Sequence, residues 1–134
     1  MISLKAQYGL RAIVSLAANY GKGPLQARQI AISQDVPVRY LELLLSQLRR
    51  ARLVEATRGK KGGYYLTKKP SQISVLDIIS AFEGSILYSQ NGTVKQDALT
   101  HVWKNAEKLI TKHFQSLKVS DLVSRLGGKA SYQI

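Results

Sequence analysis

The hydrophobic positions in the first part of the chain recur at intervals of three and four, the spacing of amphipathic helices. Segment 4–21 predicts a first helix, and its apolar stripe consists of Ala6, Leu10, Ile13, Leu16, Ala17 and Tyr20. Gly21 and the pair Gly23-Pro24 are expected to end it, because a glycine and a following proline stop helices. A shorter helix is expected within residues 25–35, with Ala27, Ile30 and Ala31 facing inward.

A third helix is predicted over roughly residues 37–52, after a tight break at Asp35-Val36-Pro37. Its apolar positions follow the i, i+3, i+4, i+7 pattern and are Leu41, Leu44, Leu45 and Leu48. Its outer face is polar and basic, with Arg39, Glu42, Ser46, Gln47, Arg49 and Arg50. Two helices joined by a short turn, the second with such a face, fit a helix-turn-helix, although helix pairs are common in any α-protein.

Two short β-type runs follow, "LVEAT" at 53–57 and "YYLTK" at 64–68, and the stretch "RGKKGG" between them has the length of a hairpin loop. A nucleotide-binding phosphate loop is excluded, because such a loop leaves a strand and enters a helix, whereas these glycines precede a strand. We interpret the stretch as a wing tip. Gly59, Gly62 and Gly63 permit the turn, and the cations Arg58, Lys60 and Lys61 are placed to reach DNA phosphates or the minor groove. The alternative is a solvated hairpin.

The remainder of the chain predicts a compact helix, a loop, a long helix and a tail. Residues 73–84 have Ser74 as a cap, Asp77 three residues on, a staple of Ile73 with Ile78, and Gly84 to close the helix. Residues 85–94 have no periodicity, and residues 119–128 are predicted to form a short helix closed by Gly127-Gly128. The long helix, 95–117, carries Leu99, Val102, Trp103, Ala106, Leu109, Ile110, Phe114 and Leu117. This stripe is expected to meet a second copy of the chain; the alternative is packing on the first helix.

Charge is distributed unevenly along the 134 residues. Residues 1–73 carry thirteen lysines and arginines against three acids (+10), and residues 74–134 carry seven against five (+2), which together make the net charge of +12. A basic front half indicates a module that binds a polyanion, although a generally basic protein with solvated charges is the competing interpretation. No apolar run is long enough to span a membrane and no signal peptide is recognisable, so a cytoplasmic location is expected.

The residue types in the chain give little support for a catalytic site or a metal site. The chain has no cysteine, which excludes disulfides, thiolate zinc sites and cysteine-ligated iron–sulfur clusters. His101 and His113 join no ligand cluster, and Asp97 with His101 is interpreted as a helix-surface pair. No nucleophile stands beside a base, so we do not expect an enzyme.

Four stretches together resemble one known family, the Rrf-type winged helix-turn-helix transcriptional regulators of the IscR, NsrR and CymR kind. They are "QYGLRAIVSLA" at 7–17, "YLELLLSQLRRARLV" at 40–54, "RGKKGGYYL" at 58–66 and "ISVLDIISAFEG" at 73–84, and "ALTHVW" at 98–103 extends the similarity. The resemblance implies a mainly α fold with a small β-hairpin wing. It implies a DNA-binding domain at 1–84, an effector loop at 85–94, and a dimerisation helix with its tail at 95–134.

The resemblance also implies a function and a set of contacts. A bacterial homodimer, most simply a repressor, would bind double-stranded DNA at an inverted repeat. The residues expected at DNA are Lys5, Tyr8, Arg28, Arg39, Tyr40, Glu42, Gln47, Arg50, Arg58, Gly59, Lys60 and Lys61; those expected at the dimer contact are Leu99, Val102, Trp103, Ala106, Leu109, Ile110 and Phe114. Glu42 suits cytosine N4 and Arg39 suits guanine. The alternatives are a helical pair of Glu42 with Arg39 or Arg49, and ordinary core roles for Tyr8 and Tyr40.

The chain departs from the cluster-binding members of that family in the segment after Glu83-Gly84. Those members place three cysteines there, whereas this chain has none, and Ala98 stands where the last would be. We therefore expect no cofactor, and a small-molecule effector or a partner enzyme as the signal. A winged-helix adaptor whose partner is a protein or metabolite remains the alternative function, and the basic front half argues against it.

Overall fold

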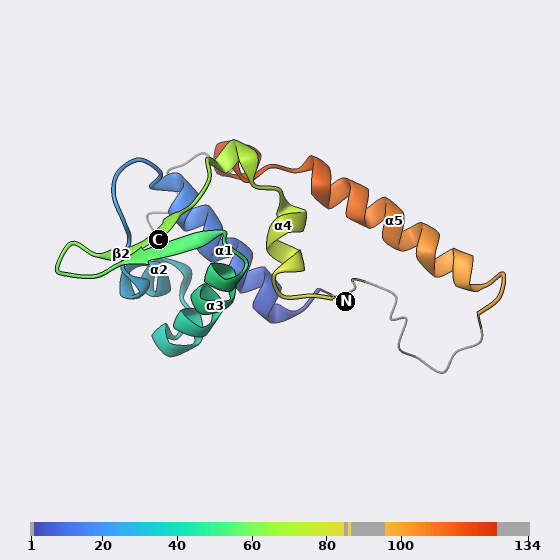
Figure 1. Cartoon of the computed structure of the whole chain (residues 1–134), viewed down its shortest axis with the longest axis horizontal. Helices are drawn as coiled ribbons and strands as arrows, with labels where there is room; N and C mark the ends of the chain where they lie inside the picture. The colour runs from blue at the N-terminus through green and yellow to red at the C-terminus, as the bar shows by residue number, and fades with distance from the viewer. Residues whose placement is uncertain (1, 85, 87–95, 126–134) are drawn as a thin grey trace.

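The computed structural model describes residues 2–84, 86 and 96–125. In chain order its elements are α1 (Leu4–Ala18), α2 (Ala27–Gln34), α3 (Val38–Arg50), β1 (Val54–Thr57), β2 (Gly63–Leu66), the 3-10 turn η1 (Pro70–Gln72), α4 (Val75–Ser80), α5 (Thr100–Ser116) and α6 (Val119–Arg125). Figure 1 shows α1 to α4 and the hairpin packed into one body, from which α5 extends. The expected architecture, mainly helical with a small hairpin wing, is confirmed. No helix in the described ranges is long and apolar enough to cross a membrane.

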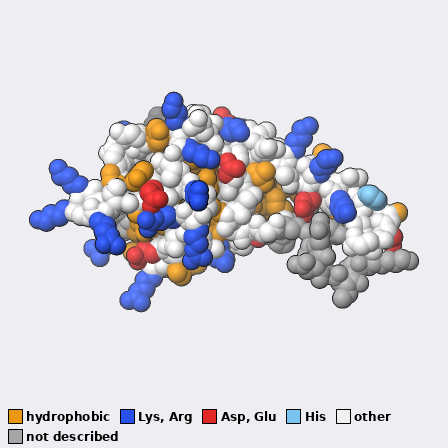
Figure 2. Space-filling model, in the orientation of Figure 1, with side chains coloured by type: hydrophobic (Ala, Val, Ile, Leu, Met, Phe, Trp, Pro, Cys, Tyr) orange, Lys and Arg blue, Asp and Glu red, His pale blue; other side chains and the backbone are white. Residues whose placement is uncertain are grey.

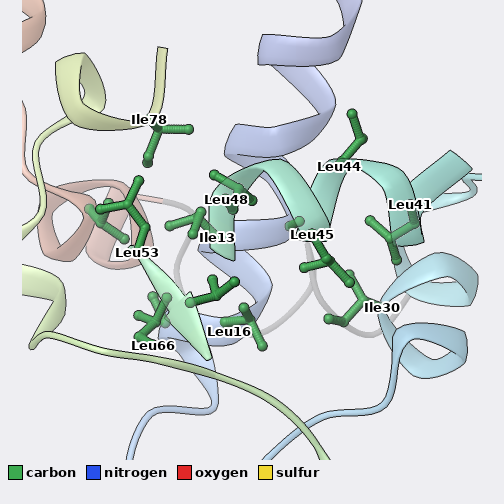
Figure 3. Packing of buried hydrophobic residues seen from close by; sticks show 14 of the residues in the cluster. Ile13, Leu16, Ile30, Leu41, Leu44, Leu45, Leu48, Leu53, Leu66 and Ile78 are labelled. Carbon is green, nitrogen blue, oxygen red and sulfur yellow. The ribbon is translucent and has the colours of Figure 1, made fainter. Parts of the chain in front are cut away.

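The core lies where α1 crosses α2 and α3, and the hairpin closes it (Figure 3). The predicted leucine stripe of α3 is confirmed: all four members are at most 1% exposed. On α1 the stripe holds except for Tyr20, which is 46% exposed and lies beyond the end of the helix. The physical reason is the turn that follows Ala18, where Gly21 takes a φ of +84° and Lys22 donates its N–H to the Asn19 carbonyl at 3.0 Å.

The third helix is shorter than predicted. It begins at Val38, with Pro37 as the preceding cap residue, and ends at Arg50. Arg52 adopts a left-handed φ of +63°, which turns the chain from α3 into β1. The Thr67 hydroxyl donates to the Arg52 carbonyl at 2.7 Å and so holds this turn to the end of the hairpin.

The wing is an antiparallel hairpin in which Val54 faces Leu66 and Thr57 faces Gly63. A third extended residue joins it: Leu25 and Tyr64 exchange backbone hydrogen bonds of 2.9 and 2.7 Å. Gly63 makes this approach possible, because its φ is +150° and a Cβ built on it would lie 2.5 Å from the Leu25 carbonyl oxygen. The hairpin is thereby fixed to the segment that leads into α2.

The capping predicted for the compact helix is confirmed, but its predicted end at Gly84 is wrong. Ser74 Oγ accepts from the Asp77 N–H at 3.0 Å, and Asp77 Oδ2 accepts from the Ser74 N–H at 2.9 Å. The helix ends at Ser80 because the next residues turn toward α1. The Phe82 ring lies against Gly9, where a Cβ would come within 2.3 Å of it. Glu83 accepts a hydrogen bond from the Ser3 N–H at 2.7 Å.

The long helix also begins later than the sequence predicts, at Thr100 rather than at residue 95. Asp97 forms a local turn before it: its Oδ1 accepts from the Leu99 N–H at 2.9 Å, and its N–H donates to Thr100 Oγ1 at 3.1 Å. The carboxylate therefore caps this turn, and the expected pair with His101 is not formed in the described structure. The effector loop 85–94, apart from the buried Ile86, and Gly127-Gly128 lie outside the described residues.

The C-terminal helices are attached to the winged body by backbone hydrogen bonds. The Val75 N–H donates to the Leu117 carbonyl at 2.9 Å, and the Val119 N–H donates to the Ile73 carbonyl at 2.8 Å. Val119 is fully buried in the main core, and α6 packs against α1. The last turns of α5 are thus anchored, while its first turns project from the body (Figure 1).

Candidate nucleic-acid interface

The turn between α2 and α3 places the two helices as a helix-turn-helix. Asp35 takes a left-handed φ of +54°, and its neighbour Val36 is buried in the core. The Val36 N–H donates to the Ala31 carbonyl at 2.9 Å, which holds the turn against the end of α2. Because the apolar stripe of α3 is buried in the core, the opposite face of the helix is directed to solvent.

That solvent face carries most of the predicted α3 residues. Arg39, Glu42 and Arg50 are exposed, whereas Gln47 is half-buried. Among the described residues Glu42 makes no ion pair, so its proposed pairing with Arg39 or Arg49 is not formed. Arg49 instead binds across to the wing.

The Arg49–Glu55 contact joins the end of α3 to β1. Arg49 Nε lies 2.6 Å from Glu55 Oε1, and both side chains are about half exposed. The Ala56 N–H and then Arg49 donate hydrogen bonds to the Glu55 carboxylate and hold its pKa below the ordinary 4.5. The carboxylate therefore stays charged at neutral pH and keeps Arg49 engaged, which leaves Arg39 and Arg50 as the cations of the α3 face.

One residue of this face was missed by sequence reasoning. Leu43 is 65% exposed, although it is a large apolar side chain within a helix. The available signal was its position: two residues after Leu41, it lies about 200° round the helix from that residue, on the side away from the buried stripe. Sequence reasoning considered only polar and charged residue types on this face and therefore did not include Leu43.

Tyr8 and Tyr40 connect α1 with the start of α3. Their rings pack edge to face with centroids 5.9 Å apart, and both residues are half-buried beside the core. The rings of both tyrosines therefore pack beside the core, as the alternative interpretation expects. Lys5, one turn earlier on α1, is exposed, and so is Arg28 near the start of α2.

The wing tip presents its three cations to solvent. Arg58, Lys60 and Lys61 are all exposed, and the turn beneath them closes through a hydrogen bond from the Gly62 N–H to the Gly59 carbonyl at 3.0 Å. Gly59 has a φ of +107°, and a Cβ on Gly62 would lie 2.4 Å from the Thr57 carbonyl oxygen. The predicted role of these glycines in forming the turn is confirmed.

A hollow beside the wing tip extends the basic surface toward α2. It has a volume of about 390 Å³, and its lining includes Lys22, Gln26, Gln29, Lys60 and Lys61. The Gln26 side-chain amide also lies 3.5 Å from the Lys60 carbonyl. Sequence reasoning did not include Lys22, because only the folded chain brings the loop after α1 next to the wing. Figure 2 shows lysine and arginine side chains gathered over this end of the molecule.

The predicted dimer residues divide along α5 into two groups. Leu99, Val102, Trp103 and Leu109 are 69%, 53%, 56% and 71% exposed. Ile110 and Phe114 instead pack within the chain, against the small cluster that contains Val75, Ile79 and Ile86, and Ala106 is half-buried. Within the chain, the main contact of α5 is with α4. Leu10 of the first helix packs against the same small cluster.

Comparison with known proteins gives a consistent result. The family model Rrf2, described as an iron-dependent transcriptional regulator, matches residues 2–125. The HTH-type transcriptional regulator CymR of Bacillus subtilis is 34% identical over 96% of this chain and 93% of its own. The solved structure of B. subtilis CymR, titled the global cysteine regulator, superposes with a TM-score of 0.83 at 34% identity, covering 93% of this chain and 97% of that one. T. potens IscR superposes with a TM-score of 0.81 at 34% identity, covering 94% and 88%.

The residues of this chain do not fit an iron centre of the cysteine-ligated kind. The whole sequence lacks cysteine, and no group of three histidine, aspartate or glutamate side chains that could hold a metal occurs in the described ranges. Asp97, beside Ala98, uses its carboxylate to cap the turn before α5. The chemistry of such a cluster is therefore not assigned to this chain.

Proposed function

The chain belongs to the Rrf2 family of transcriptional regulators, and from this premise we propose that it is a homodimeric repressor that binds an inverted-repeat operator in the bacterial cytoplasm. The observation that carries the proposal is the juxtaposition of a solvent-facing α3 with a basic wing tip and a basic hollow, all on the +10 half of the chain. A recognition helix in the major groove, with a wing beside it, is the docking that such an arrangement favours.

The side chains divide into those that read bases and those that position the protein. Glu42 suits cytosine N4 as an acceptor, and Arg39 suits the O6 and N7 atoms of guanine as a fork of donors. Arg58 suits the minor groove, where a narrow width concentrates negative potential. The positioning contacts to phosphates are assigned to Lys5, Tyr8, Arg28, Tyr40, Gln47, Arg50, Gly59, Lys60 and Lys61.

A second copy of the chain is the proposed cover of the exposed α5 face. Four large exposed apolar side chains, three on α5 and one just before it, are costly to leave in water, and a two-fold axis would bury the same surface on both copies. The N-terminal domain 1–84 would then read one half-site, and the helix and tail of 95–134 would set the spacing between half-sites. The proposed signal is a small molecule or a partner enzyme that acts through residues 85–94.

The test is a selection of bound DNA from a random pool at about 0.15 M salt, where exposed charges are largely screened beyond about 8 Å. Enrichment of an inverted repeat is expected, with half-sites one helical turn or a multiple apart. A pool that stays random would overturn the proposal. The basic surface would then be an electrostatic footprint, and an acidic protein partner of a winged-helix adaptor would become the better explanation.

A further inference from the structure

Leu43 occupies the middle of the solvent face of α3. Arg39 precedes it by four residues, Ser46 and Arg50 follow it by three and seven, and all four lie on the side of the helix opposite the buried leucines. Residues three and four apart are neighbours on a helix surface. Arg39 and Ser46 therefore flank the leucine, and Arg50 lies one turn beyond Ser46 on the same face; Arg39 and Arg50 are the cations assigned to DNA.

Packing in the core does not require a leucine at position 43. The buried stripe of α3 is complete without it, as Figure 3 shows for Leu41, Leu44, Leu45 and Leu48. A single exposed leucine is ordinary on a protein surface, so its exposure alone indicates nothing. Its position does indicate a role, because an apolar group at the centre of a base-reading face can recognise only an apolar feature of the groove.

The major groove offers one such feature, the 5-methyl group of thymine. The isobutyl group of Leu43 has no hydrogen-bond donor or acceptor, so it cannot distinguish the other base edges except by exclusion. Each half of the dimer would present the same leucine, and an inverted repeat would present the same thymine to each.

We propose that Leu43 is a specificity-determining residue that contacts the 5-methyl group of a thymine in each half-site. The proposal rests on the proposed function, since it requires α3 to lie in the major groove. It predicts that the selected repeat carries an invariant thymine near the centre of the α3 footprint, beside the bases that Arg39 and Glu42 read.

The test replaces each half-site thymine in turn by deoxyuridine, symmetrically in both halves, and measures the dissociation constant. Deoxyuridine lacks only the methyl group. Loss of one buried methyl is expected to weaken binding about fourfold per half-site, or on the order of 15-fold for both, at one thymine position. The variant Leu43→Ala should bind the thymine duplex more weakly and should lose the discrimination against deoxyuridine at that position.

The matched control is Ile32→Ala, because Ile32 is a similarly large side chain, 72% exposed on α2, with no assigned contact. It should keep the full discrimination. Circular dichroism of Leu43→Ala should match the unsubstituted protein, because the removed side chain lies outside the core.

The outcomes separate the two proposals. If the unsubstituted protein prefers the repeat to a scrambled duplex yet ignores deoxyuridine at every position, the assignment of Leu43 is overturned and the operator model stands. The same follows if Leu43→Ala keeps the discrimination. If the protein binds repeat and scrambled duplex equally, both proposals fail.

Discussion

At the residue scale, the cations of the wing tip differ in what their chemistry allows. Arg58 carries a planar guanidinium with several donors in a fixed fork, whereas Lys60 and Lys61 carry compact, strongly hydrated point charges. The fork suits a defined position in the minor groove, and the point charges suit phosphates. Because all three side chains are exposed on one turn, the effects of substituting them can be compared directly.

We predict that Arg58→Ala weakens operator binding by about 1–3 kcal/mol per half-site and relaxes the base preference at one position in each half-site. Lys61→Ala, the matched variant, should weaken binding to all sequences about equally and lower the salt slope by about one per protomer, or about two for the dimer. Both effects are measured by titrating each variant with the selected repeat and with its single-base variants. An equal loss for Arg58→Ala on every duplex would reduce Arg58 to a phosphate contact.

The glycines of the wing give a second comparison at this scale. Gly59 and Gly63 both have positive φ, but only Gly63 lies against other backbone, with a Cβ position 2.5 Å from the Leu25 carbonyl oxygen. Gly59→Ala should lower the free energy of unfolding by about 1–2 kcal/mol, the cost of the left-handed backbone. Gly63→Ala should lower it further, because the Leu25–Tyr64 pairing must separate. Equal values in urea denaturation would contradict this account of the wing anchor.

At the element scale, long-range contacts decide where helices end. The hydrophobic spacing predicted each helix and the hairpin, because burial of one face imposes that spacing. It did not predict that α4 ends at Ser80, since the turn after it is fixed by Phe82 on Gly9 and by Glu83 on Ser3. Both partners lie in α1 or just before it and are invisible to a local pattern. Lys22 was missed for the same reason, whereas Leu43 was accessible to a helical-wheel argument.

The Ser3–Glu83 contact makes stability depend on pH. Hydrogen bonds from the Ser3 side chain and its backbone N–H hold the pKa of Glu83 below the ordinary 4.5. A group whose pKa is lower in the folded state stabilises the fold above its unfolded pKa, and this contribution is lost as pH falls through the folded pKa. Glu83→Gln should therefore be less stable than the unsubstituted protein at pH 7. The two should converge in thermal unfolding only as pH falls through the lowered folded pKa of Glu83; a difference independent of pH would contradict the contact.

At the scale of the whole molecule, the account depends on what covers α5. Its last turns are fixed to the body through Leu117 and Val119, so the exposed first turns are held in a defined direction rather than free to fold back. The apolar side chains there are the surface through which we propose that two copies meet. The surface that we propose reads DNA lies on the winged body at the other end of the molecule (Figure 1).

We predict that Leu109→Glu converts the protein to a folded monomer, because a charge would be buried at the two-fold contact. Sedimentation should show the smaller species while circular dichroism stays unchanged. The matched variant Gln115→Glu adds the same charge at an exposed site on a different face of α5 and should remain dimeric. A dimer that survives Leu109→Glu would place the interface elsewhere.

The most direct test of the central claim is an anisotropy titration at about 0.15 M salt on three duplexes: the selected repeat, the repeat with one half-site scrambled, and a fully scrambled sequence. We predict that the repeat binds about a thousandfold or more tightly than the scrambled duplex, with the single half-site between them. The affinity for the repeat should also fall linearly with salt on logarithmic axes. Equal affinity for all three duplexes would contradict the claim that this chain reads DNA sequence as a dimer.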